Sequence, residues 1–184
     1  MQQRSRPLIR LPMRPLGAHR LQLDQDQFRR IMGHFATGVT ILTTALGDEL
    51  HGMTANALCS VSLDPLLVLV CVNKQARTHA MLNASGVFAL NVLAEEQEQL
   101  SRLFADETAD AGRILKGLSH CRGVTGAPIL ADCLAYVECR VVATYPGGDH
   151  SIFMGAVEDA GVLREGQPLV FFRSAYGLNP KARD

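Results

Sequence analysis

Three short segments combine residue types that could bind or act on a small polar ligand. The first, residues 52–62, reads GMTANALCSVS and carries hydroxyl and amide side chains within a β-like run. Buried polar groups need hydrogen-bond partners. The segment is therefore either an exposed edge strand with polar outward positions, or a strand that lines a site for a planar, hydrogen-bonding molecule.

The second segment, residues 71–78, reads CVNKQART and runs from an apolar strand directly into a helix start. Helix N-termini present unpaired N–H groups that suit anions, and a forked guanidinium suits phosphate. Lys74, Arg77 and Thr78 could therefore hold a phosphate group. The alternative is that they are ordinary solvated loop residues.

The third segment is Gly148-Asp149-His150, at a hairpin before an apolar run. A histidine facing a pocket there could donate a hydrogen bond to a ligand carbonyl or phosphate and titrate near neutral pH. The alternative is a plain surface position.

Other chemistries have no motif in the chain. No HxxxH or HExxH spacing occurs, so we expect no metal site. GxGxxG and GxxxxGK[ST] are also missing, so a Rossmann or P-loop site is unsupported. The odd number of cysteines, without a CxxC pair, predicts free thiols in a reducing, cytoplasmic compartment. They are Cys59, Cys71, Cys121, Cys133 and Cys139.

A β-rich domain with few helices must position these segments. Apolar and β-branched runs predict strands over residues 39–46, 51–62, 66–72, 87–93, 131–145, 151–163 and 169–174. The 66–72 strand is expected to be central and buried on both faces. Short strand spacing favours a β-barrel with flanking helices over a βαβ sheet. We expect a mainly β fold with Greek-key-like connections.

Three helices and one long loop complete the prediction. Asp24 can cap a helix reaching Thr37, with one buried face. That face carries Phe28, Ile31, Met32 and Phe35. Shorter helices are expected over residues 76–83, closed by Gly86, and over residues 95–104. Residues 106–127 are expected to form a long loop with a helical stretch near 113–118, which could act as a mobile lid.

Composition and charge narrow the function classes. The chain has 184 residues, of which 47% are hydrophobic and 20% charged, which indicates one globular domain. Eighteen basic residues balance eighteen acidic ones, so no excess charge favours nucleic acid or a membrane surface. The longest apolar run, residues 66–72, is far shorter than the ~20 residues of a membrane-spanning helix.

The basic residues are unevenly distributed. Residues 1–23 contain five arginines, no acidic residue and the prolines Pro7, Pro12 and Pro15. We expect this segment to be a disordered N-terminal extension. The domain is expected over residues 24–178, followed by a short tail, 179–184.

Taken in order, the motifs resemble those of the short-chain flavin reductase family. The similarity covers about residues 28 to 177: FRRIMGHFATGVTILTT, HGMTANALCSVSLDPLLVLVCVNKQART, GVFALNVLAEEQEQLSRLFA, GAPIL and GGDHSIFMGAV. The family comprises NAD(P)H:flavin oxidoreductase components (EC 1.5.1.-) of two-component monooxygenases.

The resemblance implies a split β-barrel that binds FMN or FAD non-covalently, as a homodimer with the site near the subunit interface. It implies that reduced pyridine nucleotide gives a hydride to the flavin, and that reduced flavin passes to a separate flavin-dependent monooxygenase. We expect NADH rather than NADPH, because no dedicated arginine pair for a 2′-phosphate is visible.

The family motifs map onto individual residues of this chain. The resemblance places Thr54, Ala55, Asn56 and Ala57 along the isoalloxazine ring, and Ser60, Val61 and Ser62 along the ribityl chain and phosphate region. It places Cys71, Val72 and Asn73 on the adjacent strand, and Lys74, Arg77 and Thr78 toward the phosphate. It places Thr37 and Val39 near the flavin and His150 on the nicotinamide side.

Two positions depart from the family pattern. Ala57 stands where a serine is common, so one hydrogen bond to flavin is missing. Leu66 stands where a second proline is common, which concerns only the entry into the strand. Three other readings stay open: an oxidase of the pyridoxamine phosphate type, a flavin- or haem-binding carrier or sensor, and a structural interaction domain.

Overall fold

The computed structural model describes residues 23–177. The predicted extension, apart from Leu23, and the predicted tail therefore lie outside the described residues. The helices are α1 Gln25–Met32, α2 Arg77–Ser85, η1 Glu95–Gln97, α3 Glu98–Ala105 and α4 Ala111–Gly117. The strands are β1 Thr37–Gly38, β2 Thr40–Leu46, β3 Glu49–Ala55, β4 Leu58–Leu63, β5 Leu66–Asn73, β6 Val87–Val92, β7 His120–Arg122, β8 Pro128–Leu130, β9 Ala135–Gly147, β10 His150–Val162, β11 Val170–Phe172 and β12 Ala175–Tyr176.

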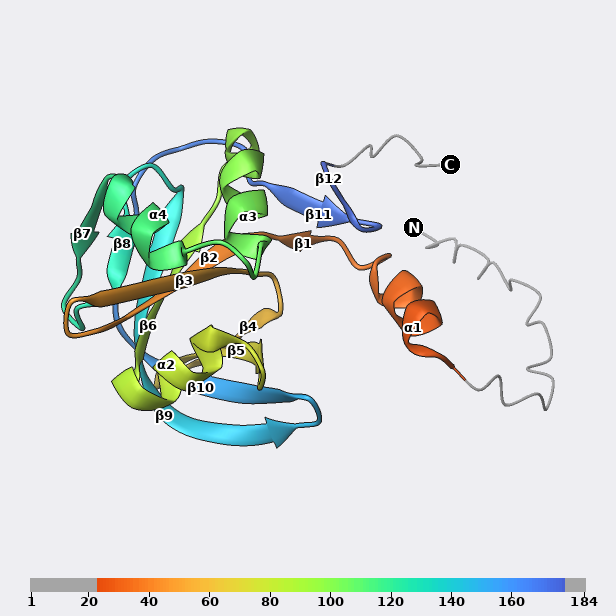
Figure 1. The fold of residues 1–184 in the computed structure, drawn as a ribbon, viewed down its shortest axis with the longest axis horizontal. Coiled ribbons are helices and arrows are strands. Elements are labelled where there is room, and N and C mark those ends of the chain that lie inside the picture. Colours follow the sequence, from red (N-terminus) through yellow and green to blue (C-terminus); the bar gives the residue numbers. More distant parts are fainter. Residues whose placement is uncertain (1–22, 178–184) are drawn as a thin grey trace, which may run out of the picture.

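Seven antiparallel strands form the main sheet, in the order β3-β2-β6-β9-β10-β5-β4. The sheet curls into a barrel, with α2, α3 and α4 packed around it (Figure 1). Register shifts in β10, between Met154 and Gly155 and between Val157 and Asp159, bend the long β9–β10 hairpin. Since β3 and β4 end the sheet order, each keeps one free edge. The predicted mainly β barrel with flanking helices is confirmed.

The barrel interior is apolar and tightly packed. One cluster centres on Phe88, Phe153, Val70 and Leu82, which are almost completely buried. Gly155 lies against this cluster, because an added Cβ would stand 2.6 Å from the Phe88 ring. A second cluster joins β2 and β3 to α3 and α4 outside the barrel.

The predicted single strand over residues 51–62 is wrong, because two strands occupy this range. β3 pairs with β2 and β4 pairs with β5, which places them at opposite ends of the sheet order. The chain crosses between them at Asn56 and Ala57, and the Ala57 carbonyl accepts from the Cys71 amide at 2.9 Å. The polar segment therefore contributes to two separate edge strands, of which β3 is largely buried and β4 is largely exposed.

The expectation that residues 66–72 are buried on both faces is also wrong. β5 lies next to the terminal strand β4, and its burial alternates along the strand. Val70 and Val72 are buried, whereas Leu66 is 53% exposed. This alternation is the pattern of an antiparallel strand with one face on the core.

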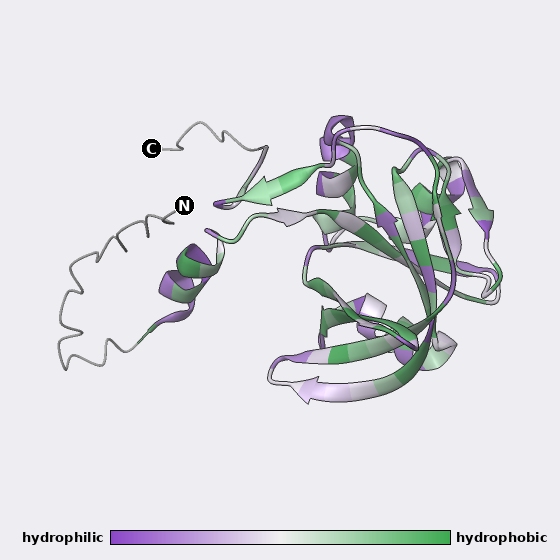
Figure 2. Ribbon diagram, turned by 180° about the vertical axis from the view of Figure 1, so that it is seen from behind, coloured by the Kyte–Doolittle hydropathy of each residue, from purple (hydrophilic) through white to green (hydrophobic). Residues whose placement is uncertain are grey.

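The first helix begins at Asp24 as predicted, with Asp24 Oδ1 accepting from the Gln27 amide at 2.7 Å. It ends at Met32 rather than Thr37, and Gly33 caps it. The prediction that one face of this helix is buried is wrong within a single copy of the chain, because no α1 residue is buried. Figure 2 shows α1, with hydrophobic positions along it, standing apart from the barrel. The exposed apolar side chains are Phe28, Ile31, Met32 and Phe35.

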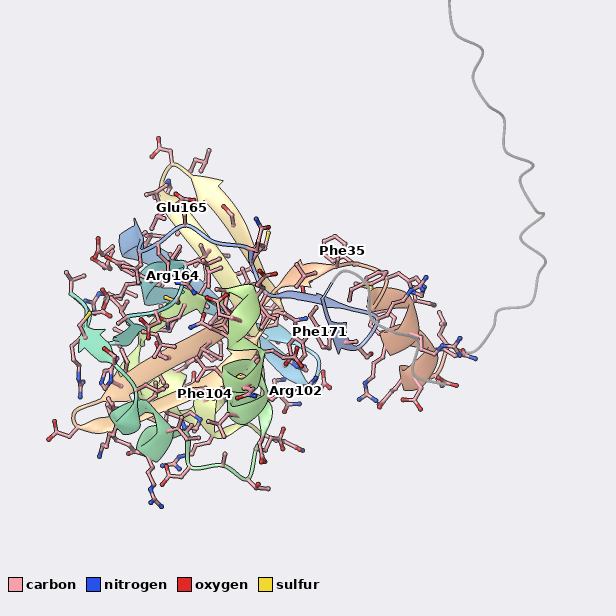
Figure 3. The ribbon with its side chains drawn as sticks, turned by 90° about the horizontal axis from the view of Figure 1, so that it is seen from above. Phe35, Arg102, Phe104, Arg164, Glu165 and Phe171 are labelled. Atoms are coloured by element: carbon pink, nitrogen blue, oxygen red, sulfur yellow. The ribbon has the colours of Figure 1, made fainter. Side chains whose placement is uncertain are left out.

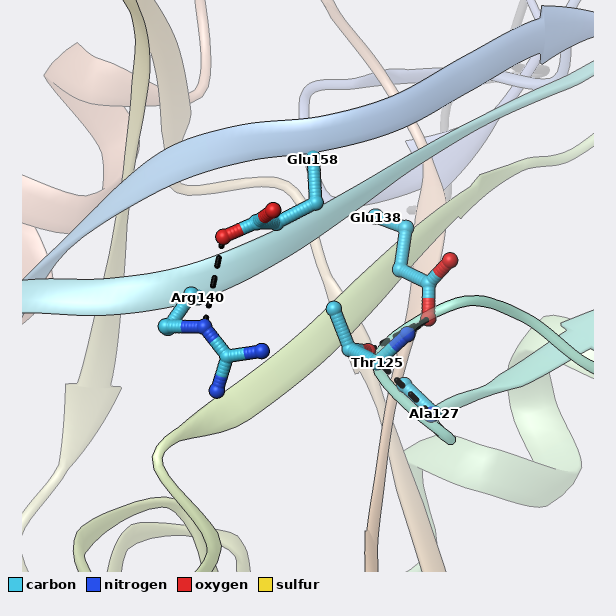
Figure 4. A network of polar contacts seen from close by, with 5 residues as sticks. All are labelled: Thr125, Ala127, Glu138, Arg140 and Glu158. Atoms are coloured by element: carbon cyan, nitrogen blue, oxygen red, sulfur yellow. Dashed lines mark hydrogen bonds and ion pairs between the residues drawn. The ribbon is translucent and has the colours of Figure 1, made fainter.

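Residues 106–127 are more ordered than a long loop. They contain α4 and β7, and β7 pairs with β8. The turn before β8 is anchored by the buried carboxylate of Glu138 (Figure 4). This carboxylate accepts from the amides of Val124 and Thr125, at 2.8 and 2.6 Å, and from the Thr125 hydroxyl.

None of the helices in the described range has the length and apolarity that a membrane crossing requires.

Candidate functional site

The main cavity, about 810 Å³, runs along the free edge of β3. Its lining includes His51 and Met53 as well as Gly52 and Thr54. Successive strand residues point to opposite faces, so the cavity wraps around the strand edge. An edge strand leaves alternate backbone N–H and C=O groups unpaired. These groups can serve a flat heterocycle that needs hydrogen bonds in its own plane.

The start of α2 forms one wall of the cavity through Gln75, Ala76, Arg77 and Thr78. The N-cap residue Ala76 has no side chain that can cap the helix. Among the described residues, the amides of Arg77 and Thr78 have no acceptor. An uncapped N-terminus with a guanidinium beside it is a suitable site for a phosphate group. The Arg77 guanidinium meanwhile pairs with Glu49 Oε1 at 2.7 Å.

Aromatic side chains close the opposite wall. Phe104 comes from α3, Phe171 from β11 and Tyr176 from β12. Figure 3 shows Arg102 and Phe104 on α3, with Phe171 on the neighbouring strand. The Tyr176 hydroxyl lies 2.8 Å from Ser101 Oγ, and the Thr54 hydroxyl donates to the Ser101 carbonyl at 2.6 Å. These bonds tie β3, α3 and β12 into one wall.

His51 is the least satisfied polar side chain of the site. It is 8% exposed, lines the cavity, and its buried Nδ1 has no hydrogen-bond partner. Burial, followed by the nearby Arg77 cation, lowers the pKa of His51 despite the opposing effect of Glu49 and Asp110. The ring is therefore neutral at pH 7, with one donor and one acceptor nitrogen.

Five predicted ligand residues line this cavity: Val39, Thr54, Asn56, Arg77 and Thr78. Thr37 is joined to them, because Asn56 Nδ2 donates to its hydroxyl at 3.1 Å. Ala55 is buried beside them within the core.

A second group of predicted residues surrounds the end of β5. His150 pairs in register with Asn73, and Ser151 with Val72. The Lys74 ammonium donates to the Gly148 carbonyl at 2.6 Å. His150 Nδ1 lies 2.9 Å from Asp149 Oδ1, and this bond lowers the pKa of the Asp149 carboxyl. The group, which includes Cys71, adjoins the cavity through the 73–76 connection, because Asn73 Oδ1 accepts from the Gln75 amide.

The remaining predicted residues lie outside the cavity. Ala57 is in the crossover, and Ser60, Val61 and Ser62 are on the edge strand β4. β4 is largely exposed in this chain.

Ser151, His79 and Asn83 are arranged in a way that resembles a hydrolase triad. The direction of their hydrogen bonds, however, does not allow His79 to accept a proton from the serine. His79 Nε2 lies 2.9 Å from Ser151 Oγ. The Asn83 amide nitrogen donates to the His79 carbonyl and lies 3.2 Å from His79 Nδ1. Nδ1 therefore accepts, Nε2 carries the hydrogen, and the ring cannot act as a base toward the serine. Within residues 23–177, no group of three or more His, Cys, Asp or Glu side chains is arranged to hold a metal ion.

Sequence reasoning missed several cavity residues. His51, Phe104, Phe171, Tyr176 and the 105–111 turn all line the cavity. His51 gave a signal because it directly precedes the polar 52–62 segment, and the 105–111 turn gave one because it overlaps the loop predicted over residues 106–127. The others come from distant segments that only the fold brings together.

The fold and site define a small antiparallel barrel with an elongated ligand cavity at a sheet edge. The model of the "Flavin reductase like domain" family matches residues 32–178, which is most of the chain. The chain therefore belongs to the flavin reductase like family, as its motifs indicated.

Individual relatives support this family membership. An "NADH-dependent FAD reductase" of Streptomyces globisporus is 45% identical over 73% of this chain and 74% of its own length. "NADH-dependent FMN reductase AsuE2" of Streptomyces nodosus subsp. asukaensis is 40% identical over 83% of each chain. The reductase subunit HsaB of a flavin-dependent monooxygenase from Rhodococcus jostii is 36% identical, over 86% of this chain and 80% of its own.

Among solved structures, BorF is similar. It is the flavin reductase component of a bacterial two-component tryptophan halogenase. It superposes with a TM-score of 0.80 at 38% identity, covering 86% of this chain and all of its own.

Proposed function

We propose that this chain is an NADH-dependent flavin reductase, an NAD(P)H:flavin oxidoreductase (EC 1.5.1.-), that supplies reduced FMN or FAD to a separate flavin-dependent monooxygenase. The observation that carries the proposal is the cavity along the free edge of β3, with the uncapped start of α2 in its wall. Family membership and the relatives' activities support it.

The residues present fit a non-covalent flavin. Free backbone groups of β3 can hold the ring edge, the Arg77 and Thr78 amides can hold a phosphate, and Phe171 and Tyr176 can exclude water. When bound, flavin and NADH supply the redox chemistry themselves, by passing a hydride from one ring to the other. The chain's task is to hold the two rings in contact and to stabilise negative charge with oriented N–H donors.

Steady-state oxidation of NADH tests the proposal. With excess free flavin, we expect turnover of many equivalents of NADH per chain. An oxidase would keep its flavin and need no free supply. A carrier or interaction domain would give no turnover, and that result would reject the proposed function.

We infer that His150 serves the nicotinamide side of the site. It lies at the strand end beside Asn73 and is 40% exposed, so it can meet an incoming ring. His150→Ala is expected to raise the NADH KM or to lower kcat by roughly tenfold, the size expected for one lost hydrogen bond to a reacting ligand. The flavin Kd should stay the same, and a loss of flavin affinity instead would remove this assignment. Asp149→Asn weakens the hydrogen bond that orients the His150 ring. It should change the NADH KM or kcat in the same direction as His150→Ala, but by less.

We also propose that the active form is a homodimer in which a second copy covers the apolar face of α1. Phe28 and Ile31 are 57% exposed and Phe35 is 71% exposed. An amphipathic helix with an uncovered apolar face is typical of an interface. The expected flavin residues Ser60, Val61 and Ser62 also lie outside the cavity of one chain, so one copy leaves the predicted site incomplete.

The pair Phe28→Asp and Ile31→Asp is expected to halve the mass measured by light scattering and to weaken flavin binding. Arg29→Asp, on the polar side of the same helix, is the matched control and should stay dimeric. A wild-type chain that is monomeric at working concentration would overturn the dimer proposal without affecting the assignment of the cavity.

A further inference from the structure

The β11–β12 hairpin carries two aromatic residues of the cavity wall but stands outside the barrel sheet. It forms a small sheet with β1, and this sheet shares no strand with the seven-stranded one. Figure 1 shows the hairpin projecting beyond the barrel. Besides its pairing with β1, the Leu169 amide donates to the Leu93 carbonyl at 2.9 Å, and the Arg173 amide donates to the Gly33 carbonyl at 2.8 Å. A segment that is held by few bonds can open without unfolding the rest of the protein.

Ser101 of α3 joins this hairpin to the edge strand β3. Ser101 is completely buried, its hydroxyl lies 2.8 Å from the Tyr176 hydroxyl, and its carbonyl accepts from the Thr54 hydroxyl at 2.6 Å. Among residues 23–177, the Ser101–Tyr176 bond is the one side-chain hydrogen bond that the hairpin makes. Thr54 and Tyr176 line the cavity, whereas Ser101 does not. Ser101 therefore connects two walls of the cavity without contacting a ligand inside it.

Arg102, the next residue of α3, contacts the ring of the same tyrosine. Its Nε and Nη2 atoms donate to Glu98 Oε1 at 2.9 and 2.7 Å, which fixes the direction of the guanidinium group. The guanidinium carbon lies 4.8 Å from the centroid of the Tyr176 ring, within the range of a cation–π contact. Phe171 packs against this ring in a T-shaped arrangement, with centroids 5.3 Å apart. The hydroxyl and one face of Tyr176 are thus occupied, and the remaining ring surface contributes to the cavity lining.

We propose that Ser101 and Arg102 are positioning residues that hold Tyr176 against α3 and so keep the hairpin closed over the cavity. When these contacts break, Tyr176 leaves the cavity wall and a bound ligand dissociates faster. This inference rests on the proposed function and extends it, because flavin is the ligand whose residence time is measured. The two residues act through Tyr176, since neither of them lines the cavity.

The tyrosines of the chain provide a direct signal for this contact. The chain has three tyrosines and no tryptophan, so near-ultraviolet circular dichroism without ligand reports on tyrosine rings that are fixed by packing. The part of the signal that Tyr176→Phe removes belongs to Tyr176. We expect Ser101→Ala to lose most of this part. Ser85→Ala is the matched control and should keep it, because Ser85 Oγ also lies 2.8 Å from a hydroxyl, that of Thr44, but does not line the cavity.

The rate of flavin release gives the functional readout. Full-length protein is loaded with FMN and diluted rapidly, and the fluorescence of the released flavin is followed. Ser101→Ala and Tyr176→Phe are each expected to raise the dissociation rate by about threefold to tenfold, the factor that one intramolecular hydrogen bond supplies. The association rate should change less, as is usual for variants of one binding site.

A double variant separates positioning from general destabilisation. If the two hydroxyls act through their mutual bond, Ser101→Ala combined with Tyr176→Phe should release flavin no faster than either single variant. Ser85→Ala should lower the Tm about as much as Ser101→Ala, yet release flavin at the wild-type rate. Dissociation rates that multiply in the double variant, or an equal rise in Ser85→Ala, would overturn the inference.

Arg102→Gln keeps the test valid if Ser101→Ala folds poorly, because the Arg102 side chain is 53% exposed. It should also reduce the Tyr176 signal and raise the dissociation rate by about twofold to fivefold, as expected for an exposed cation–π contact. Arg140→Gln, which likewise loses a pair with a surface glutamate, is its control and should change neither.

The inference and the proposed function can fail separately, because the circular dichroism needs no ligand. An unchanged Tyr176 signal in Ser101→Ala, or a lost signal without faster flavin release, would overturn the inference, and the reductase function would stand if NADH turnover persists. A wild-type chain that binds no flavin would reject the inference and the proposed function together.

Discussion

Ala76→Asp is expected to stabilise the protein and at the same time to weaken flavin binding by roughly 30- to 100-fold. Ala76 is the N-cap residue of α2, with extended backbone angles (φ −68°, ψ 141°) and no side-chain cap. An aspartate there can accept from the free amides of the first turn, which is worth about 0.5–2 kcal/mol. The same carboxylate would occupy the position we assign to the flavin phosphate. The loss follows from charge-assisted hydrogen bonds worth about 1.5–3 kcal/mol, at about 1.4 kcal/mol per tenfold in Kd.

Two measurements check this prediction together. Thermal unfolding without ligand should show a Tm higher by about 2–4 °C for each kcal/mol gained in a chain of this size. Flavin titration should show the rise in Kd. Ala76→Ser caps without a charge and should give a similar Tm with a smaller loss of affinity. A raised Tm with unchanged flavin affinity would mean that the phosphate does not bind at the start of α2.

Glu138→Ala is expected to be the most destabilising single polar substitution, at about 3 kcal/mol, because two amides and a hydroxyl lose a buried acceptor. Glu138 is completely buried, and the turn before β8 is built around its carboxylate. Gly123 lies so close that an added Cβ would stand 2.1 Å from Glu138 Oε2. Removing the carboxylate should therefore loosen the whole 123–127 turn.

Chemical denaturation measures this effect, and the neighbouring ion pair supplies the control (Figure 4). Glu158 pairs with Arg140 at 3.2 Å on the surface, with side chains 41% and 57% exposed. Glu158→Ala should change the unfolding free energy by no more than about 0.5 kcal/mol, as for most exposed pairs. Similar losses in the two variants would show that the Glu138 bonds do not hold the turn.

Strand and helix predictions succeeded where local pattern decides the structure. The β-branched run of β2, the Asp24 cap and the end of α2 at Gly86 are all local features. Gly86 has a φ of 67°, a left-handed conformation that glycine adopts without strain, so its role as a helix end could be read from the residue type.

The predictions failed where the result depends on a distant segment. Residues 51–62 read as one strand, since alternation cannot show that Thr40 pairs with Ala55 whereas Leu58 pairs with Val70. The apolar spacing of α1 indicated a buried face, but spacing does not say whether the same chain or another covers it.

The sequence by itself determined the β-rich class, the start of α1 at Asp24, the end of α2 at Gly86, and the ordered motifs that identify the family. The tertiary structure alone decided which of those polar residues share a cavity. Thr54 and Thr78 meet aromatic side chains from β11 and β12 because the antiparallel sheet leaves β3 at its edge. Edge position and cavity shape follow from long-range pairing, which is a property of the folded chain and is not encoded in any local window of residues.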